Sequence, residues 1–355
     1  MSTIVWEGNW AMRKALVPMV VLIFLWSPAR AQLFVSNVSK VGTTAATFLE
    51  MPVGARAMGM GNAFVASARD ASALYWNPGG AAAITTNQVL VQHTNWLGET
   101  TFDYAALVVP LGGFGNLGAS VTAFQSGDMA VRNEQFPEGT GVYFDVADVA
   151  IGLSYARMLT DRFSIGFNAK YIQQRIWHET ASGFAFDLGT MFVTEFLNGM
   201  RIGATISNFG TTMKMTGADL RQFHPIDPTK LGTNQRIPQD IETDGWPLPL
   251  TFQFGLATEV VKSEDHRFTL AVDALYPSDN FASLNAGGEY GFKNLVFLRA
   301  GYQAISLRDH EGGASAGIGV KYESPFSSLM VGVDYAYNDY GRLSATHTLS
   351  LMLGF

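Results

Sequence analysis

Apolar residues recur at every second position in a series of runs that extends from residue 87 to the end of the chain. In the run 162–177, Phe163 and Ile165 share one face, while Ser164 and Gly166 share the other. An amphipathic helix would repeat its apolar residues with a period near 3.6, whereas a strand alternates with a period of two. Runs of roughly ten alternating residues are long enough for a tilted strand to cross a bilayer. The pattern therefore predicts membrane-spanning strands.

Fourteen runs follow this pattern, and an even number is what a bacterial single-chain barrel requires. They occupy residues 87–96, 101–110, 116–125, 146–159, 162–177, 182–196, 200–209, 249–261, 266–276, 282–292, 294–306, 314–324, 328–338 and 342–355. The links alternate between short turns, typical of the periplasmic end, and longer links at 126–145, 210–248, 277–281 and 307–313, as expected of extracellular loops. The sequence predicts an all-β transmembrane fold, a 14-stranded antiparallel outer-membrane β-barrel.

Charged residues within the runs lie on the less apolar face. They are Asp103, Lys170, Asp187, Glu259, Asp273, Glu289, Arg299, Lys321 and Asp334. A basic residue that faces lipid near the midplane costs about 2–4 kcal/mol. We therefore expect all nine side chains to point into the lumen. The same face is rich in Gly, Ala and Ser, which leaves room for something inside the barrel.

Alternation alone would also suit a soluble β-sandwich or propeller. The end of the chain, "THTLSLMLGF", favours the membrane. Leu349, Leu351 and Leu353 alternate up to the terminal Phe355. This ending is similar to the C-terminal signal by which the barrel-assembly machinery recognises outer-membrane strands. Outer-membrane lipid and that machinery are therefore expected partners.

The start of the chain reads as a secretory signal. Arg13 and Lys14 precede the apolar run "ALVPMVVLIFLW", and Ala29 and Ala31 have the spacing that signal peptidase requires. We expect residues 1–31 to be a signal peptide, with Met12 as a candidate initiator. An uncleaved anchor is the alternative, but the apolar core is short for a bilayer span of roughly 20 residues.

Composition and motifs argue against several classes of function. Only 15% of the residues are charged, and the formal net charge is -7. Nucleic-acid binding calls for clustered Lys and Arg, so no such partner is expected. The chain has no cysteine, and its six histidines lie in no recognisable catalytic motif. We expect no enzymatic activity, no cofactor and no metal site.

Residues 32–86 do not follow the strand pattern, and we expect them to form a small plug or hatch inside the barrel of residues 87–355. The stretch "ASARDASALYW" predicts a short helix that ends at Asn77 and Pro78, because the residue before a proline is disfavoured in the helical region. Gly79 and Gly80 would then allow a turn into the first strand.

The stretch "GARAMGMGNAFVASARDASALYWNPGGAA" resembles the N-terminal signature of the PorV/PorQ family of FadL-like outer-membrane proteins. The residues that carry the resemblance include Gly54, Arg56, Gly59, Gly61, Asp70, Asn77, Pro78 and Gly80. Gly79 stands where a residue such as Ala is usual. We further expect Arg56 and Asp70 to anchor the plug to wall residues of opposite charge such as Asp187, Glu289 or Arg299.

The resemblance implies two functions. PorV-like proteins of the type IX secretion system bind secreted proteins by their C-terminal sorting domains and shuttle them to a surface attachment complex. FadL-like proteins instead take up hydrophobic small molecules passively. The signature lies closer to the first group. The long link 210–248 carries Met213, Met215, Phe223 and Trp246, which we interpret as exposed residues of a partner-binding loop or of a mobile lid.

Overall fold

The computed structural model describes residues 40–224, 229, 236–307, 310 and 312–355. The expected signal peptide, with Ala29, Ala31 and Met12, lies outside the described residues, so its cleavage stays a prediction. Among the described residues, no helix combines the length and the hydrophobicity needed to span a membrane.

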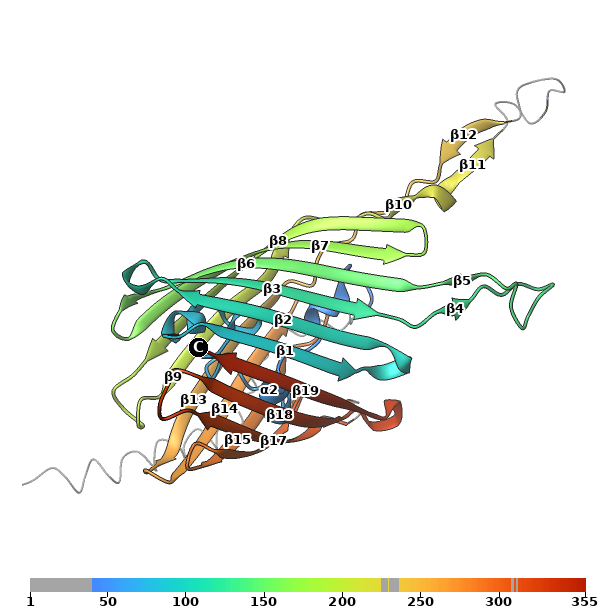
Figure 1. Cartoon of the computed structure of the whole chain (residues 1–355). Coiled ribbons are helices and arrows are strands. Elements are labelled where there is room, and N and C mark those ends of the chain that lie inside the picture. The colour runs from blue at the N-terminus through green and yellow to red at the C-terminus, as the bar shows by residue number, and fades with distance from the viewer. Residues whose placement is uncertain (1–39, 225–228, 230–235, 308–309, 311) are drawn as a thin grey trace, which may run out of the picture. The chain divides into compact units, whose positions relative to one another are not determined.

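Fourteen antiparallel strands close into a barrel (Figure 1). They are β1 (Gln88–Asn95), β2 (Thr101–Pro110), β3 (Asn116–Gln125), β6 (Val146–Thr160), β7 (Phe163–Ile176), β8 (Glu179–Val193), β9 (Arg201–Gly210), β13 (Thr251–Lys262), β14 (His266–Pro277), β15 (Ser283–Phe292), β16 (Val296–Tyr302), β17 (Ala314–Glu323), β18 (Met330–Asp339) and β19 (Ala345–Gly354). Each strand pairs with the next in this order, and β19 pairs with β1 to close the sheet. The predicted barrel is confirmed, and every predicted run becomes a strand with ends displaced by a few residues.

The two ends of the barrel differ in their connections. At the short-turn end, brief links such as 161–162 and 263–265 join the strands, and the chain terminates there. At the long-loop end, β4 (Met129–Ala130) pairs with β5 (Tyr143–Phe144), and β11 (Arg221–His224) pairs with β12 (Ile237–Asp240). Both hairpins project beyond the barrel strands (Figure 1). Such asymmetry is typical of bacterial outer-membrane barrels, whose short turns lie in the periplasm and whose long loops lie outside the cell.

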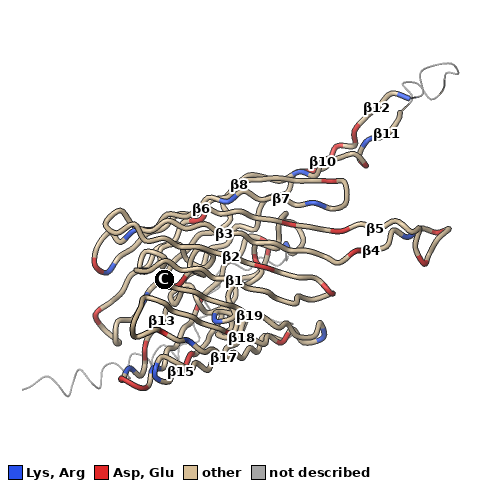
Figure 2. Tube along the Cα trace, viewed as in Figure 1, with Lys and Arg blue, Asp and Glu red and all other residues tan. Residues whose placement is uncertain are grey.

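The outer face of the strands is apolar. Its exposed side chains include Val91, Leu107, Val121, Ile151, Leu153, Phe167, Phe184, Phe186, Phe252, Phe254, Leu270, Val272, Leu298, Ile318, Val320, Val333, Leu349 and Leu351. Lys, Arg, Asp and Glu gather mainly in the turns and loops (Figure 2). In water so large an exposed apolar surface would be a liability, whereas lipid accommodates it.

Eight of the nine charged strand residues point inward as expected, but Asp103 does not. In β2 the buried positions include Phe102 and Tyr104, so Asp103 has the opposite orientation and its side chain is 47% exposed. Both faces of this strand carry large apolar residues, and the inward set packs against residues within the barrel. Asp103 pairs with His93 at 2.6 Å, close to the long-loop end, where an outward charge costs less.

Residues 40–86, the N-terminal segment, contain only short helical elements. These are η1 (Thr47–Glu50), α2 (Ala55–Gly59), α3 (Ala73–Trp76) and η2 (Pro78–Ala83). The predicted helix before Asn77 is thus only α3, and α2 was not predicted. Asn77 is extended and ends α3, as predicted, but Gly79 and Gly80 lie inside η2 rather than in a turn. A Cβ at Gly80 would approach the Ala68 carbonyl oxygen to 1.8 Å, so close packing requires this glycine.

The N-terminal segment packs against inward-facing glycines of the barrel. A Cβ added at Gly166 would lie 2.3 Å from the Pro78 carbonyl carbon, and one at Gly287 would lie 2.0 Å from the Met60 carbonyl oxygen. On another strand, Gly317 faces Gly59 in the same way. Because these wall positions are glycines, no side chain fills the space that the backbone of the N-terminal segment occupies.

We predict that Gly287→Ala lowers the thermal stability of the barrel, because its Cβ would overlap the Met60 carbonyl oxygen. Overpacking of this kind costs about 1–3 kcal/mol. The midpoint of heat unfolding in detergent, followed by the electrophoretic shift between folded and unfolded barrel, measures the effect. Gly288→Ala is the matched control, since a Cβ there meets only outward side chains at 3.4 Å. Equal midpoints for the two variants would contradict the proposed packing.

Candidate functional site

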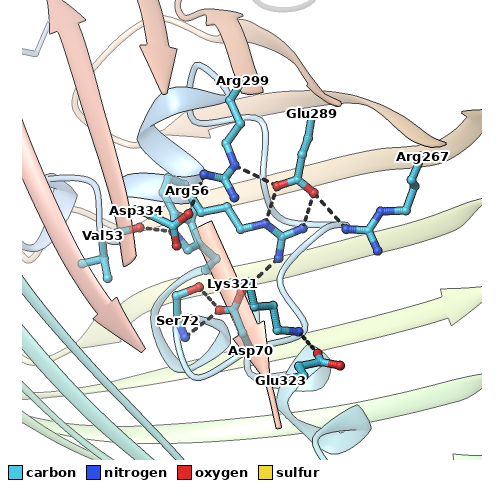
Figure 3. A network of polar contacts seen from close by, with 11 residues as sticks. Val53, Arg56, Asp70, Ser72, Arg267, Glu289, Arg299, Lys321, Glu323 and Asp334 are labelled. Atoms are coloured by element: carbon cyan, nitrogen blue, oxygen red, sulfur yellow. Dashed lines mark hydrogen bonds and ion pairs between the residues drawn. The ribbon is translucent and has the colours of Figure 1, made fainter. Parts of the chain in front are cut away.

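A network of charged side chains joins the N-terminal segment to the barrel wall (Figure 3). Arg56 of α2 donates two hydrogen bonds to Glu289 of β15, from Nε to Oε2 at 2.8 Å and from Nη2 to Oε1 at 2.9 Å. Its Nη1 lies 3.1 Å from Oδ2 of Asp70. Such a bidentate pair fixes both the distance and the orientation of the two groups.

Glu289 is the centre of this network. Its side chain is 1% exposed, and it also accepts a hydrogen bond from Arg299 Nε at 2.8 Å. Arg267 Nη2 approaches its Oε1 at 3.5 Å, and Arg299 continues to Asp334 Oδ1 at 2.6 Å. A buried carboxylate is tolerated when opposite charges and hydrogen bonds compensate it. Three arginines supply that compensation.

Of the three wall residues expected to anchor the plug, only some make the predicted contacts. Glu289 contacts Arg56 directly, whereas Arg299 reaches Arg56 through Glu289. Asp187 instead pairs with Lys170 at 2.8 Å, both on the wall. Asp70 binds within its own segment, to Arg56 and to the Ser72 backbone N–H at 3.0 Å. It orients Arg56 and does not itself form an ion pair with a wall residue among the described contacts.

The remaining signature residues make close backbone contacts. Asn77 donates from Nδ2 to the carbonyl oxygens of Val65 and of Thr190 in β8, at 3.1 and 2.9 Å, while its Oδ1 accepts from Gly79 N. Pro78 follows at the start of η2. Gly54 and Gly61 have φ of 87° and 61°, the left-handed region that favours glycine. Gly59 packs on Gly317.

The four hydrophobic residues of the long link lie in different environments. Met213 is 1% exposed, because its backbone pairs with Trp246 and its side chain joins a cluster with Phe48 and Leu248. Its interpretation as an exposed contact residue was wrong. Met215 packs partly against the same cluster. Phe223 and Trp246 are exposed, at 66% and 47%.

The C-terminal residues complete the wall. Leu349, Leu351 and Phe355 are exposed on the outer face, and Leu353 is half-buried. Phe355 exchanges backbone hydrogen bonds with Asn87 at 3.0 and 3.1 Å, which extends the β1–β19 pairing to the last residue. Recognition of this strand by the assembly machinery stays a prediction.

A cavity of about 660 Å³ opens within the barrel towards the long-loop end. The N-terminal segment contributes Leu49, Glu50, Met51, Tyr75 and Trp76 to its lining, and the wall and loops contribute Trp96, Lys170, Thr251, Asp279, Phe281 and Tyr340 among others. Sequence reasoning did not identify this cavity, because its residues come from distant parts of the chain and form no local motif.

Glu50 is a titratable group of this cavity whose pKa is shifted so that the neutral form is favoured. It is accessible from the cavity, yet the surrounding protein displaces much of its hydration. Burial, together with the neighbouring Asp279 carboxylate, raises the pKa of Glu50 to about 7, although Thr251 opposes the shift.

Comparison with known proteins identifies the family. The sequence model of the family described as "Type IX secretion system protein PorV" matches residues 35–237, more than half of the chain. The protein belongs to the PorV family. The match spans the N-terminal segment and the strands from β1 to β9, and so supports the resemblance of the signature. The comparison with curated proteins gave no match.

Solved structures share the fold of this PorV family member. The Pseudomonas putida toluene transporter TodX is 12% identical, with a TM-score of 0.54 over 85% of this chain and 97% of that chain. A Pseudomonas aeruginosa FadL homologue is 11% identical, with a TM-score of 0.52 over 85% and 98% of the two chains. Identities this low establish the FadL-like fold alone. Together with the family, they identify a bacterial outer-membrane protein.

We predict that Arg56→Ala destabilises the barrel, because Glu289 loses two charged hydrogen bonds in a buried site. Bonds to charged groups contribute about 1.5–3 kcal/mol each, and the remaining pair with Arg299 should keep the loss near the lower end. Heat unfolding in detergent measures it. Arg162→Ala is the control, since the Arg162–Glu195 pair is exposed at the short-turn end. Unchanged heat stability of Arg56→Ala would remove the anchoring interpretation.

We predict that Glu50→Gln raises the unfolding temperature at about pH 8 more than at about pH 5. The folded-state pKa of Glu50 is raised to about 7, so folding favours the protonated form of this side chain. The wild-type protein therefore loses stability as the pH rises from the ordinary pKa of glutamate through 7. Glutamine mimics the protonated form, so its advantage grows once wild-type Glu50 ionises. A pH-independent difference between the two proteins would contradict the raised pKa.

Proposed function

We propose that this protein binds secreted proteins by their C-terminal sorting domains and shuttles them to the attachment complex at the cell surface, in concert with other type IX secretion components. The observation that carries the proposal is the PorV family match over residues 35–237. This region includes the N-terminal segment and most of the long-loop end, where a secreted partner would arrive.

The projecting hairpins supply the contact surface in this proposal. Exposed apolar side chains at the long-loop end include Phe136, Val142, Tyr143, Phe223, Ile241 and Trp246. Large exposed apolar groups rimmed by polar residues mark protein-binding surfaces. The β11–β12 hairpin is suited to such contacts because it projects from the barrel (Figure 1). Cargo would thus dock on the projecting hairpins and not inside the lumen.

The N-terminal segment acts as a plug in this proposal, with residues 32–86 as one functional unit and 87–355 as the barrel. Its residues Val53, Ala55, Ala57, Met58 and Phe64 have no exposed surface. Asp273 of β14 accepts hydrogen bonds from the backbone N–H groups of Phe64 and Val65, at 2.6 and 2.8 Å. A segment held this closely keeps the lumen closed while cargo is exchanged at the surface.

Passive uptake of hydrophobic small molecules is the second candidate. The cavity near the long-loop end, with Leu49, Met51 and Phe281 in its lining, is the observation that favours it. Its volume of about 660 Å³ lies within the range typical of ligand sites. Uptake of toluene by bacterial cells that produce the protein, compared with cells that lack it, tests this function. Equal uptake by the two kinds of cell would reject it.

We predict that deletion of residues 214–244 abolishes or strongly reduces release of secreted cargo while the barrel still assembles. Met213 and Trp246 are hydrogen-bonded to each other at the base of the link, so a short connection can replace the deleted residues. The secreted fraction of cargo in the culture medium measures the effect. Unchanged secretion would contradict docking on this loop.

A point variant refines the test. Phe223→Ser should reduce secretion because it removes an exposed apolar contact from β11, with no effect on heat stability. Phe114→Ser is the matched control, since Phe114 is 80% exposed at the short-turn end, away from arriving cargo. A comparable loss of secretion in both variants would indicate a general defect rather than docking.

A further inference from the structure

The cavity at the long-loop end brings together two carboxylates that lie far apart in the sequence. Glu50 belongs to η1 of the N-terminal segment, and Asp279 belongs to the link between β14 and β15. Both line the cavity, and they are close enough that Asp279 makes ionisation of Glu50 less favourable. Two carboxyl groups from distant parts of the chain thus share one cavity.

Asp279 has unused hydrogen-bonding capacity. The residue is 6% exposed, and its Oδ2 accepts a hydrogen bond from Thr44 Oγ1 at 2.9 Å. Its Oδ1 has no hydrogen-bond partner among the described residues. A buried carboxylate oxygen without a partner carries a desolvation cost that a donor from a ligand would remove.

No basic residue of the described chain forms an ion pair with either carboxylate. Lys170 also contributes to the lining, and its Nζ lies 2.8 Å from Asp187 Oδ1. The positive charge of Lys170 is thus already compensated by the wall. Glu50 and Asp279 leave the cavity with an excess of negative charge and of acceptors.

Aromatic rings form another part of the lining. Tyr75, Trp76, Trp96 and Tyr340 all contribute to it. Trp76 Nε1 donates to the Val53 carbonyl oxygen at 2.7 Å, so its polar edge is occupied. Trp96 and Tyr340 pack edge to face with ring centroids 5.5 Å apart. Ring faces attract cations as well as apolar groups.

We propose that this cavity is a binding site for an alkylammonium or guanidinium group, which Glu50 and Asp279 hold while the alkyl stem lies among the aromatic side chains. The N–H groups of such a cation supply the donors that Asp279 Oδ1 lacks. The cation also compensates both negative charges. A free organic cation and a Lys or Arg side chain of a polypeptide share this chemistry. The site goes beyond the secretion role, which does not depend on it.

Calorimetric titration of the full-length protein in detergent tests the proposal with two probes. Agmatine represents a free organic cation, and the peptide acetyl-Gly-Gly-Lys-Gly-Gly-amide represents a basic side chain. We expect at least one of them to bind. Glu50→Gln and Asp279→Asn should each weaken this binding by roughly tenfold or more, as expected for loss of a hydrogen bond to a charged group. The variants relieve repulsion, so both should fold.

Glu264→Gln is the matched control, because Glu264 is exposed in a turn at the short-turn end. It should bind the probes as wild type does. Binding of agmatine alone would assign the site to a small cation, and binding of the peptide alone would assign it to a polypeptide. The same peptide with norleucine in place of lysine should not bind. Equal binding of the two peptides, no binding of either cation, or unchanged affinity in both carboxylate variants would overturn the proposal.

The pH dependence gives an independent readout. Burial and Asp279 raise the pKa of Glu50 to about 7, so cation affinity should increase between about pH 6 and pH 8 as Glu50 ionises. The other ionisable groups of the lining are Asp279, Lys170, His310, Tyr75 and Tyr340. Any contribution of these groups to the pH profile persists in Glu50→Gln. A pH profile that Glu50→Gln leaves unchanged would remove Glu50 from the site.

Discussion

Close contact between the backbone of the N-terminal segment and the inward-facing glycines of the strands is the constraint on which the interior depends. A barrel of this strand number encloses more space than its wall side chains fill. Gly166, Gly287 and Gly317 keep side chains out of that space, and the segment enters it. The position of the segment then determines where the charged network and the cavity lie.

Charge makes the contact specific. Glycines allow the segment to approach the wall, but a backbone packed on glycine could slide along a strand. The pairing of Arg56 with Glu289 and of Asp273 with the N–H groups of Phe64 and Val65 favours one register. A displaced segment would separate Arg56 from Glu289 and would leave the buried Asp273 without its two donors. The free energy lost by an unpaired buried charge is large compared with that of an exposed ion pair.

The surfaces that would carry the two candidate functions lie in different parts of the molecule. Exposed apolar residues of the projecting hairpins face outward from the long-loop end, whereas the cavity lies within the barrel beside the segment. The solved structures that share this fold include toluene transporters, while the family of this chain is that of a secretion component. A common barrel can serve both functions because the fold supplies the wall, and the loops and lumen determine what is bound.

The sequence by itself determined the class and much of the wall. Alternation of apolar residues predicted all fourteen strands, because lipid on one side and a polar interior on the other impose a period of two on every strand. It also placed Glu289, Arg299 and Asp273 inward. It failed at Asp103, since β2 is apolar on both faces and the periodicity of such a strand does not define which side faces lipid.

Only the tertiary structure decided what the inward side chains contact. The pairing of Arg56 with Glu289 spans 233 residues of sequence, and the meeting of Glu50 with Asp279 is equally remote from any local pattern. Burial of Met213 depends on its pairing with Trp246 across a long link. Local periodicity indicates which side of a strand is apolar. The contacts named above depend instead on closure of the barrel and on the path of the N-terminal segment inside the barrel. No short stretch of sequence encodes either of these.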